Sequence, residues 1–116
     1  MEFKGIGRVF STVGDEQYRT IGAFWDELSA RYGRKNLRGL GYNWTDTSIE
    51  YVIGLIEGEI DGWNVCVQLP RDDWRRAQGR TQQLDELYRE IYKDGPLKAE
   101  IETFDDEGNC VVAFVR

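Results

Sequence analysis

Aromatic side chains in the predicted strands are the residues whose type first suggests a binding function. Buried strands more often use Val, Ile or Leu, but this sequence places several Trp and Tyr residues in such segments. These residues are Tyr42, Trp44, Tyr51, Trp63 and Trp74. A ring face of this kind attracts a cation by roughly 0.5–2 kcal/mol. The pattern predicts a flat-walled cage for a lipophilic cation, and we expect Tyr51 and Trp74 to line it.

The sequence lacks the residues that several common catalytic and metal sites require. The sequence contains no His, which excludes His-based triads and most zinc sites. Cys66 and Cys110 are far apart and belong to no C-x-x-C pair, which favours buried thiols in a reducing cytoplasm. Residues 5–7 and 39–41 are Gly-x-Gly segments without the third glycine and following helix of a dinucleotide-binding loop, so we interpret them as close-packing or bulge glycines. We expect no catalytic group, metal or cofactor.

The overall charge limits the kind of partner. Fifteen Lys and Arg residues against 21 Asp and Glu give a net charge of −6. This balance argues against nucleic acid binding and favours neutral or cationic ligands. The basic group Arg71, Arg75, Arg76 and Arg80 is interleaved with acidic residues, and is either a solvated face or a contact for an acidic partner. The N-terminus begins with an acidic residue and no long apolar stretch, and nowhere does an apolar run approach the roughly 18 residues of a membrane span. We therefore expect a cytoplasmic protein that does not bind membranes.

The elements that must position the aromatic residues include two helices. The chain is long enough for one domain, residues 1–116. Apolar positions at three- and four-residue steps over 18–32 predict a helix that ends at Gly33, with Trp25 and Leu28 buried. The same spacing over 82–92 predicts a second helix, which a Gly-Pro pair follows.

Alternating and β-branched segments predict the strands. These are 3–13, 37–44, 49–56, 63–69, 98–104 and 109–115, while 73–79 is either a short edge strand or an irregular crossing. Polar turns join the second strand to the third and the last two to each other, so we expect two hairpins.

A strand, a helix and a hairpin thus occur twice in the same order, over about 1–60 and about 61–116. The repetition predicts an α+β fold made from a duplicated strand-helix-strand-strand unit. We expect two antiparallel sheets with a helix each, related by a pseudo-two-fold axis, and a central ligand groove between them.

Several segments resemble the GyrI-like small-molecule-binding family. Residues 21–28, IGAFWDEL, resemble the signature of its first helix. Residues 41–42, GY, and 50–55, EYVIGL, resemble its Gly-x-Tyr strand and its aromatic-Tyr-x-x-Gly strand. Residues 69–70, LP, are similar to the Ile-Pro that precedes its second repeat. Residues 101–106, IETFDD, resemble a family segment whose Glu is a ligand-facing carboxylate.

The resemblance covers nearly the whole chain and implies the fold of the effector-binding domains of AraC- and MerR-type regulators of bacterial transcription. Those domains bind hydrophobic and cationic drugs, so the resemblance implies multidrug binding with Glu102 at the ligand. If Ile101 packs on the second helix, alternation turns Glu102 and Phe104 toward the groove. The expected ligand-binding residues are Glu102, Tyr51, Trp74, Tyr42, Trp44 and Phe104. The other interpretation of Glu102 is an exposed carboxylate in the acidic run 100–107.

Three functions stay open. The first is a stand-alone domain that sequesters or senses a small hydrophobic, cationic compound without catalysis. The resemblance also implies a hydrolase of cyclopropane-bearing electrophiles, with Glu102 as the base and Tyr51 as its hydrogen-bonding partner. The third is a gyrase-inhibitor-like module that binds a protein partner through an exposed strand edge. Saturable binding without product would indicate the first function, and turnover of a cyclopropane substrate would indicate the second. Capture of a protein partner would indicate the third.

Overall fold

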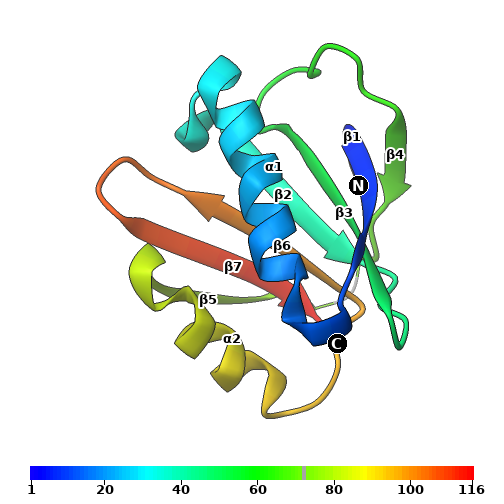
Figure 1. Cartoon of the computed structure of the whole chain (residues 1–116), viewed down its shortest axis with the longest axis vertical. Helices are drawn as coiled ribbons and strands as arrows, with labels where there is room; N and C mark the ends of the chain where they lie inside the picture. The colour runs from blue at the N-terminus through cyan, green and yellow to red at the C-terminus, as the bar shows by residue number, and fades with distance from the viewer. Residues whose placement is uncertain (72) are drawn as a thin grey trace.

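The computed structural model describes residues 1–71 and 73–116, which form an α+β fold with one antiparallel sheet. Its strands are β1 (Glu2–Ser11), β2 (Leu37–Tyr42), β3 (Ser48–Leu55), β4 (Val65–Gln68), β5 (Arg75–Arg80), β6 (Ala99–Phe104) and β7 (Asn109–Val115). Its helices are α1 (Gln17–Tyr32) and α2 (Leu84–Tyr92), with 3-10 turns η1 (Val13–Asp15), η2 (Arg34–Asn36) and η3 (Thr81–Gln83). The strand order is β4-β1-β3-β2-β6-β7-β5, and both helices pack on the same face (Figure 1).

Helix α1 forms where the sequence predicts it and covers the first half of the sheet. Its buried side chains are Phe24, Trp25 and Leu28, whose spacing places them on one side of a helix. They share a core cluster with Tyr51 of β3. The helix ends at Gly33, whose φ of 83° is a conformation that glycine adopts at little cost.

Helix α2 is shorter and covers the second half of the sheet. Its buried side chains, Tyr88 and Ile91, pack with Val112 and Phe114 of β7. Asp85 lies in the first turn, where the helix dipole favours a negative charge. Among the residues that the structure describes, neither helix is long and apolar enough to cross a membrane.

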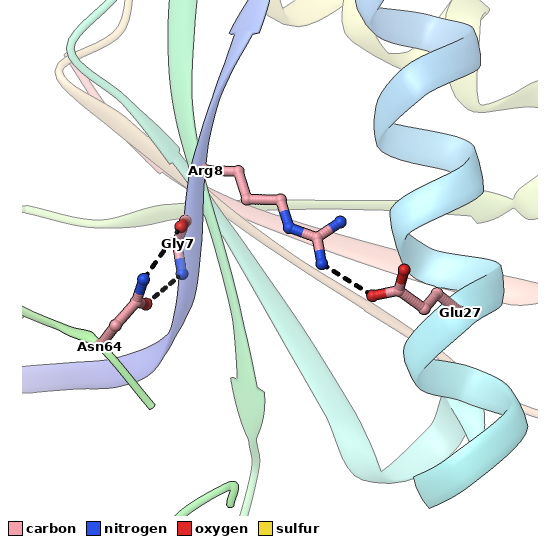
Figure 2. A network of polar contacts seen from close by, with 4 residues as sticks. All are labelled: Gly7, Arg8, Glu27 and Asn64. Atoms are coloured by element: carbon pink, nitrogen blue, oxygen red, sulfur yellow. Dashed lines mark hydrogen bonds and ion pairs between the residues drawn. The ribbon is translucent and has the colours of Figure 1, made fainter. Parts of the chain in front are cut away.

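Side chains fix β1 to its neighbours, as Figure 2 shows. Beyond the backbone pairing of β1 with β4, the Asn64 side chain accepts a hydrogen bond from the Gly7 N–H at 2.8 Å. Arg8 donates a hydrogen bond to the Glu27 carboxylate at 2.8 Å, and its guanidinium lies 4.3 Å from the centre of the Phe24 ring. The Arg8 contacts hold α1 against the first strand.

The structure corrects the prediction of two sheets, because β2 and β6 pair with each other. Their antiparallel register sets Leu40 opposite Ile101. Two separate sheets would leave the backbone donors and acceptors of these inner edges without partners. The halves β1-β3-β2 and β6-β7-β5 therefore join into one continuous sheet.

The edges of the sheet are β4 and β5. Strand β4 is shorter than the predicted strand 63–69 and pairs with β1, so it extends the first half of the sheet. Strand β5 lies where the sequence left an edge strand or an irregular crossing open, and it pairs with β7. In the second half of the chain, the strand that comes directly before α2 is therefore β5, and β4 belongs to the first half of the sheet.

The two faces of the sheet carry different cores. The face under the helices includes Tyr51 and Phe104, whereas the opposite face buries Leu40 with Ile101 packed against it. The structure therefore corrects the premise that Ile101 packs on α2. Because neighbours on a strand point to opposite faces, Glu102 points toward the helices and is buried.

Candidate functional site

A groove with a volume of about 850 Å³ lies between the two helices and the sheet. Its aromatic lining residues are Tyr18, Trp25, Trp44, Tyr51, Tyr88, Tyr92 and Phe104. Its charged lining residues are Asp15, Asp26, Asp85, Glu100 and Glu102 on the acidic side, and Arg34 and Arg89 on the basic side. Pockets for small molecules commonly have volumes of about 300–1,000 Å³, so the groove has the size of a ligand site.

Two carboxylates from β6 lie at the floor of this groove. Glu100 and Glu102 are two residues apart, so the pleat of the strand turns both side chains to the same face. Each is 6 % exposed, and within the described residues they are the buried charged side chains. Charged side chains are seldom buried without a partner, so their surroundings decide what they can do.

Glu102 accepts hydrogen bonds from two tyrosines on different elements. The Tyr51 hydroxyl, on β3, donates to Oε1, and the Tyr88 hydroxyl, on α2, donates to Oε2 at 2.6 Å. The Tyr51 oxygen in turn accepts a hydrogen bond from the Trp25 indole N–H at 2.8 Å. This chain of donors fixes the Glu102 carboxyl group between both helices and the sheet.

Glu100 has a similar partner one helical turn further along α2. The Tyr92 hydroxyl donates to its Oε2 at 2.9 Å. The rings of Tyr88 and Tyr92 stack with centroids 5.8 Å apart, as expected for residues at positions i and i+4 of a helix. Two Tyr–Glu pairs therefore lie side by side between α2 and β6. Because Tyr92 is 38 % exposed, the Glu100 pair lies nearer to the mouth of the groove.

Burial raises the pKa of both carboxyl groups. The pKa of Glu100 rises to about 8, first because burial disfavours the carboxylate and second because Glu102 is close, although the Tyr92 hydrogen bond opposes the rise. Burial also raises the pKa of Glu102, against the effect of its tyrosine hydrogen bonds. Within residues 1–71 and 73–116, no Lys or Arg forms an ion pair with either group.

Arg34 is the basic side chain that acts on Glu102 from the groove wall. Its guanidinium lies 4.3 Å from the centre of the Phe104 ring, and its charge lowers the pKa of Glu102. This effect is smaller than that of burial, so the pKa of Glu102 stays above its ordinary value.

Glycines in β2 make room for the carboxylates and their partners. Gly39 lies opposite Glu102 and Gly41 opposite Glu100 in the β2–β6 pairing. A Cβ atom at Gly39 would lie 2.7 Å from Cζ of Tyr51, and one at Gly41 would lie 3.1 Å from Oε1 of Glu100. Of the two interpretations of residues 39–41, bulge or close-packing glycines, these contacts confirm close packing, because a side chain at either glycine would crowd Tyr51 or Glu100.

The structure brings four of the six predicted site residues together. Glu102, Tyr51, Trp44 and Phe104 line the groove. Tyr42 and Trp74 do not line this groove, because they pack against the core on the opposite face of the sheet. Tyr42 follows Gly41 on β2 and so points away from the helices, and the Trp74 indole N–H donates to the backbone oxygen of Pro70 at 2.9 Å.

Sequence reasoning missed several residues of the site. Glu100 shares its face with Glu102, a consequence of period-two alternation that could have been drawn from the sequence. Tyr88 and Tyr92 are spaced one helical turn apart, but helical apolar spacing alone predicts core packing for them. Trp25 is buried as predicted, and it also lines the groove through its bond to Tyr51.

The chemistry of these groups suits a cation or a proton. Carboxylates and aromatic faces both favour positive charge, and the tyrosine hydroxyls already donate to the carboxylates. Among the described residues, no group of three or more Cys, Asp or Glu side chains could hold a metal ion. Comparisons with protein-family models, curated proteins and solved structures find no match for this chain.

Proposed function

We propose that this chain is a small-molecule-binding domain that takes a hydrophobic, cationic compound into the groove. The observation that carries the proposal is the pair of buried carboxylates, Glu100 and Glu102, at the floor of an aromatic groove of about 850 Å³. Neither forms an ion pair with a Lys or Arg among the described residues. A bound cation would supply the missing positive charge.

The walls of the groove favour the same class of ligand. Aromatic faces attract cations, and they also remove the apolar surface of a ligand from water. Trp44 and Tyr18 both line the groove, and Tyr18 is 64 % exposed. A ligand with aromatic or aliphatic groups around one positive centre therefore fits this lining better than a small inorganic ion does.

The resemblance to the GyrI-like family supports the proposal independently of the electrostatics. It implies a ligand-facing Glu at the position of Glu102, and this residue lines the groove. Outward from the β2–β6 pairing, the strand orders are β2-β3-β1 and β6-β7-β5, so the two halves mirror each other, and each half has one helix. We interpret these halves as duplicated units about a pseudo-two-fold axis, with the groove over their junction.

The domain would sequester or sense its compound in the cytoplasm, as expected for an effector-binding domain used in bacterial transcription regulation. The binding site would need no catalytic group for this role. Neutral apolar compounds would bind through the aromatic walls alone, whereas cations would also gain from the carboxylates.

The test compares an aryl trimethylammonium ion with its tert-butyl isostere, in which carbon replaces the charged nitrogen. Titration calorimetry at pH 8 should show that Glu102→Gln weakens binding of the ammonium ion by about 2–5 kcal/mol, because the variant keeps the shape and removes the charge. Binding of the neutral isostere should stay unchanged. Glu86→Gln, an exposed change on α2, is the matched control. Equal affinities of wild type and Glu102→Gln for the ammonium ion would contradict the proposal.

A second candidate function is hydrolysis of a cyclopropane-bearing electrophile. The observation that favours it is the chain of hydrogen bonds from Trp25 through Tyr51 to Glu102, which places a carboxyl group and a phenol together in a groove. Glu102 would take a proton from an attacking water while Tyr51 holds the carboxylate. Incubation with a strained cyclopropane substrate would give a ring-opened, hydrated product if this function holds, and unchanged substrate if the domain only binds.

A further inference from the structure

Glu100 and Glu102 form a pair whose charges are too close and too buried to coexist easily. Their Cα atoms are two strand residues apart, a separation of about 7 Å. Both side chains are 6 % exposed and point into the same groove. The glycines opposite them on β2 contribute no side chain that could separate or screen them.

The groups that face this pair from α2, β3 and β7 do not balance its charge. Tyr88 and Tyr92 on α2 and Tyr51 on β3 donate hydrogen bonds, and burial raises the pKa of each phenol, so they stay neutral at physiological pH. On β7, Cys110 is a buried free thiol whose pKa burial raises. Asp85 and Arg89, also on α2, are exposed side chains of opposite charge on the groove wall.

The groups on the first half of the chain add little positive charge. From η1 and α1 the groove receives Asp15, Tyr18 and Asp26, which are acidic or neutral. From η2 it receives Arg34, whose guanidinium stacks on the Phe104 ring and forms no ion pair with Glu100 or Glu102. Arg34 and Arg89 are therefore the two arginines of a groove that is also lined by five Asp and Glu residues.

We infer that the groove exchanges a proton for its ligand: the empty Glu100–Glu102 pair retains a proton, and a bound cation replaces it. The inference rests on the proposed function, because it concerns the same site and the same class of ligand. In the exchange, a carboxyl O–H bond breaks, the proton passes to the solvent, and the ligand's positive charge takes its place beside the carboxylates. The net charge of the groove is the same before and after binding.

We assign the retained proton to Glu100. The Glu102 carboxylate accepts two tyrosine hydrogen bonds, which favour its charged form, whereas Glu100 accepts one. The rise of the Glu100 pKa to about 8 agrees with this division. At pH 7 the proton therefore resides mainly on Glu100, and its release accompanies binding of the cation.

The experiment measures proton release directly. Titration calorimetry at pH 7 with the aryl trimethylammonium ion is carried out in two buffers of different ionisation enthalpy. The ammonium ion carries a permanent charge, so any proton released comes from the protein. We expect release of up to one proton per bound cation, and none for the neutral tert-butyl isostere. Between pH 6 and pH 7 the Kd for the cation should fall by up to about tenfold, the limit for one released proton.

Two variants locate the proton. Glu100→Gln should bind the cation with little proton release and with a nearly pH-independent Kd, whereas Glu86→Gln should behave as wild type does. Proton release from the wild-type protein is measured without any variant, so it tests the inference even if Glu100→Gln fails to fold. Cation binding without proton release and with the same Kd at pH 6 and pH 8 would overturn the inference and leave the proposed function intact. No cation binding at any pH would overturn the proposed function itself.

Discussion

Glu100 links the protonation of the groove to the stability of the empty protein. Its pKa is about 8 in the folded chain against an ordinary value of 4.5, so between these values the folded state binds more protons than the unfolded state. The stabilising effect of this proton is fully present below pH 4.5 and is lost as pH rises toward 8. We expect the free energy of unfolding to fall over this window, by at most about 1.4 kcal/mol per pH unit from one such group.

Replacing Glu100 by Gln isolates its share of this pH dependence. In Glu100→Gln the free energy of unfolding should fall less steeply between pH 5 and pH 8 than in wild type, because one titrating group is absent. Urea denaturation at four pH values measures the two slopes, and Glu86→Gln should retain the wild-type slope. Identical slopes for wild type and Glu100→Gln would show that Glu100 is ionised throughout this range.

Gly39 is the residue on which the hydrogen-bond chain of Glu102 depends sterically. A Cβ atom there would lie 2.7 Å from Cζ of Tyr51 and 2.8 Å from Cζ2 of Trp25. We expect Gly39→Ala to lower the free energy of unfolding by about 1–3 kcal/mol and to weaken ligand binding, because both rings must move. The matched control is Gly22→Ala in α1, where nothing lies within 4 Å of a Cβ atom. It should stabilise the helix by roughly 0.5–1 kcal/mol, so opposite signs in urea denaturation are expected.

At the scale of elements, a few buried side chains hold α1 against the sheet. Leu28 is 2 % exposed and lies in the same cluster as Trp25 and Tyr51. Leu28→Ala should lower the free energy of unfolding by about 2–5 kcal/mol, since it removes buried methyl groups and leaves a cavity. Arg19→Ala, at an exposed position of the same helix, should change it little. A loss below about half a kcal/mol for Leu28→Ala would contradict the burial of this helix face.

The elements themselves could largely be predicted from the sequence. Apolar spacing over 18–32 and 82–92 predicted both helices to within a few residues, because periodicity and glycine stops are local signals. The pairing of β2 with β6 could not be predicted in this way, since it joins residues about sixty positions apart and no local pattern encodes it. Because this pairing was not predicted, the two halves were expected to form two separate sheets.

Alternation along the strands predicted part of the candidate site, although it was anchored to the wrong face. Glu102 does point into the groove, but Ile101 packs on the face opposite to α2, so the predicted orientation had the wrong premise. Tyr42 was assigned to the groove because of its aromatic ring, whereas Gly41 occupies the groove face of that strand. A hydropathy pattern cannot show which face of a strand a glycine occupies, because glycine has no side chain.

At the scale of the whole molecule, the β2–β6 pairing makes the two halves one folding unit. Neither half can keep its groove residues in place alone, because Tyr51 comes from the first half and Glu102 from the second. We expect a single cooperative unfolding transition. Far-ultraviolet circular dichroism and Trp fluorescence should give coincident urea curves. Two separated transitions would mean that the halves unfold independently.

The two Tyr–Glu pairs between α2 and β6 also affect how the groove can adapt to ligands of different shape. Glu100 and Glu102 extend from β6, a strand inside the sheet, so the backbone that carries them is held on both sides by β2 and β7. Beside the carboxyl groups, the wall that can move is the pair of tyrosines on α2, a helix of nine residues whose Tyr88 and Tyr92 hydroxyls hold the two carboxyl groups. A bulkier ligand that displaces this wall also removes hydrogen bonds from the carboxyl groups. Breadth of ligand choice and strength of charge recognition are therefore coupled through the position of one short helix.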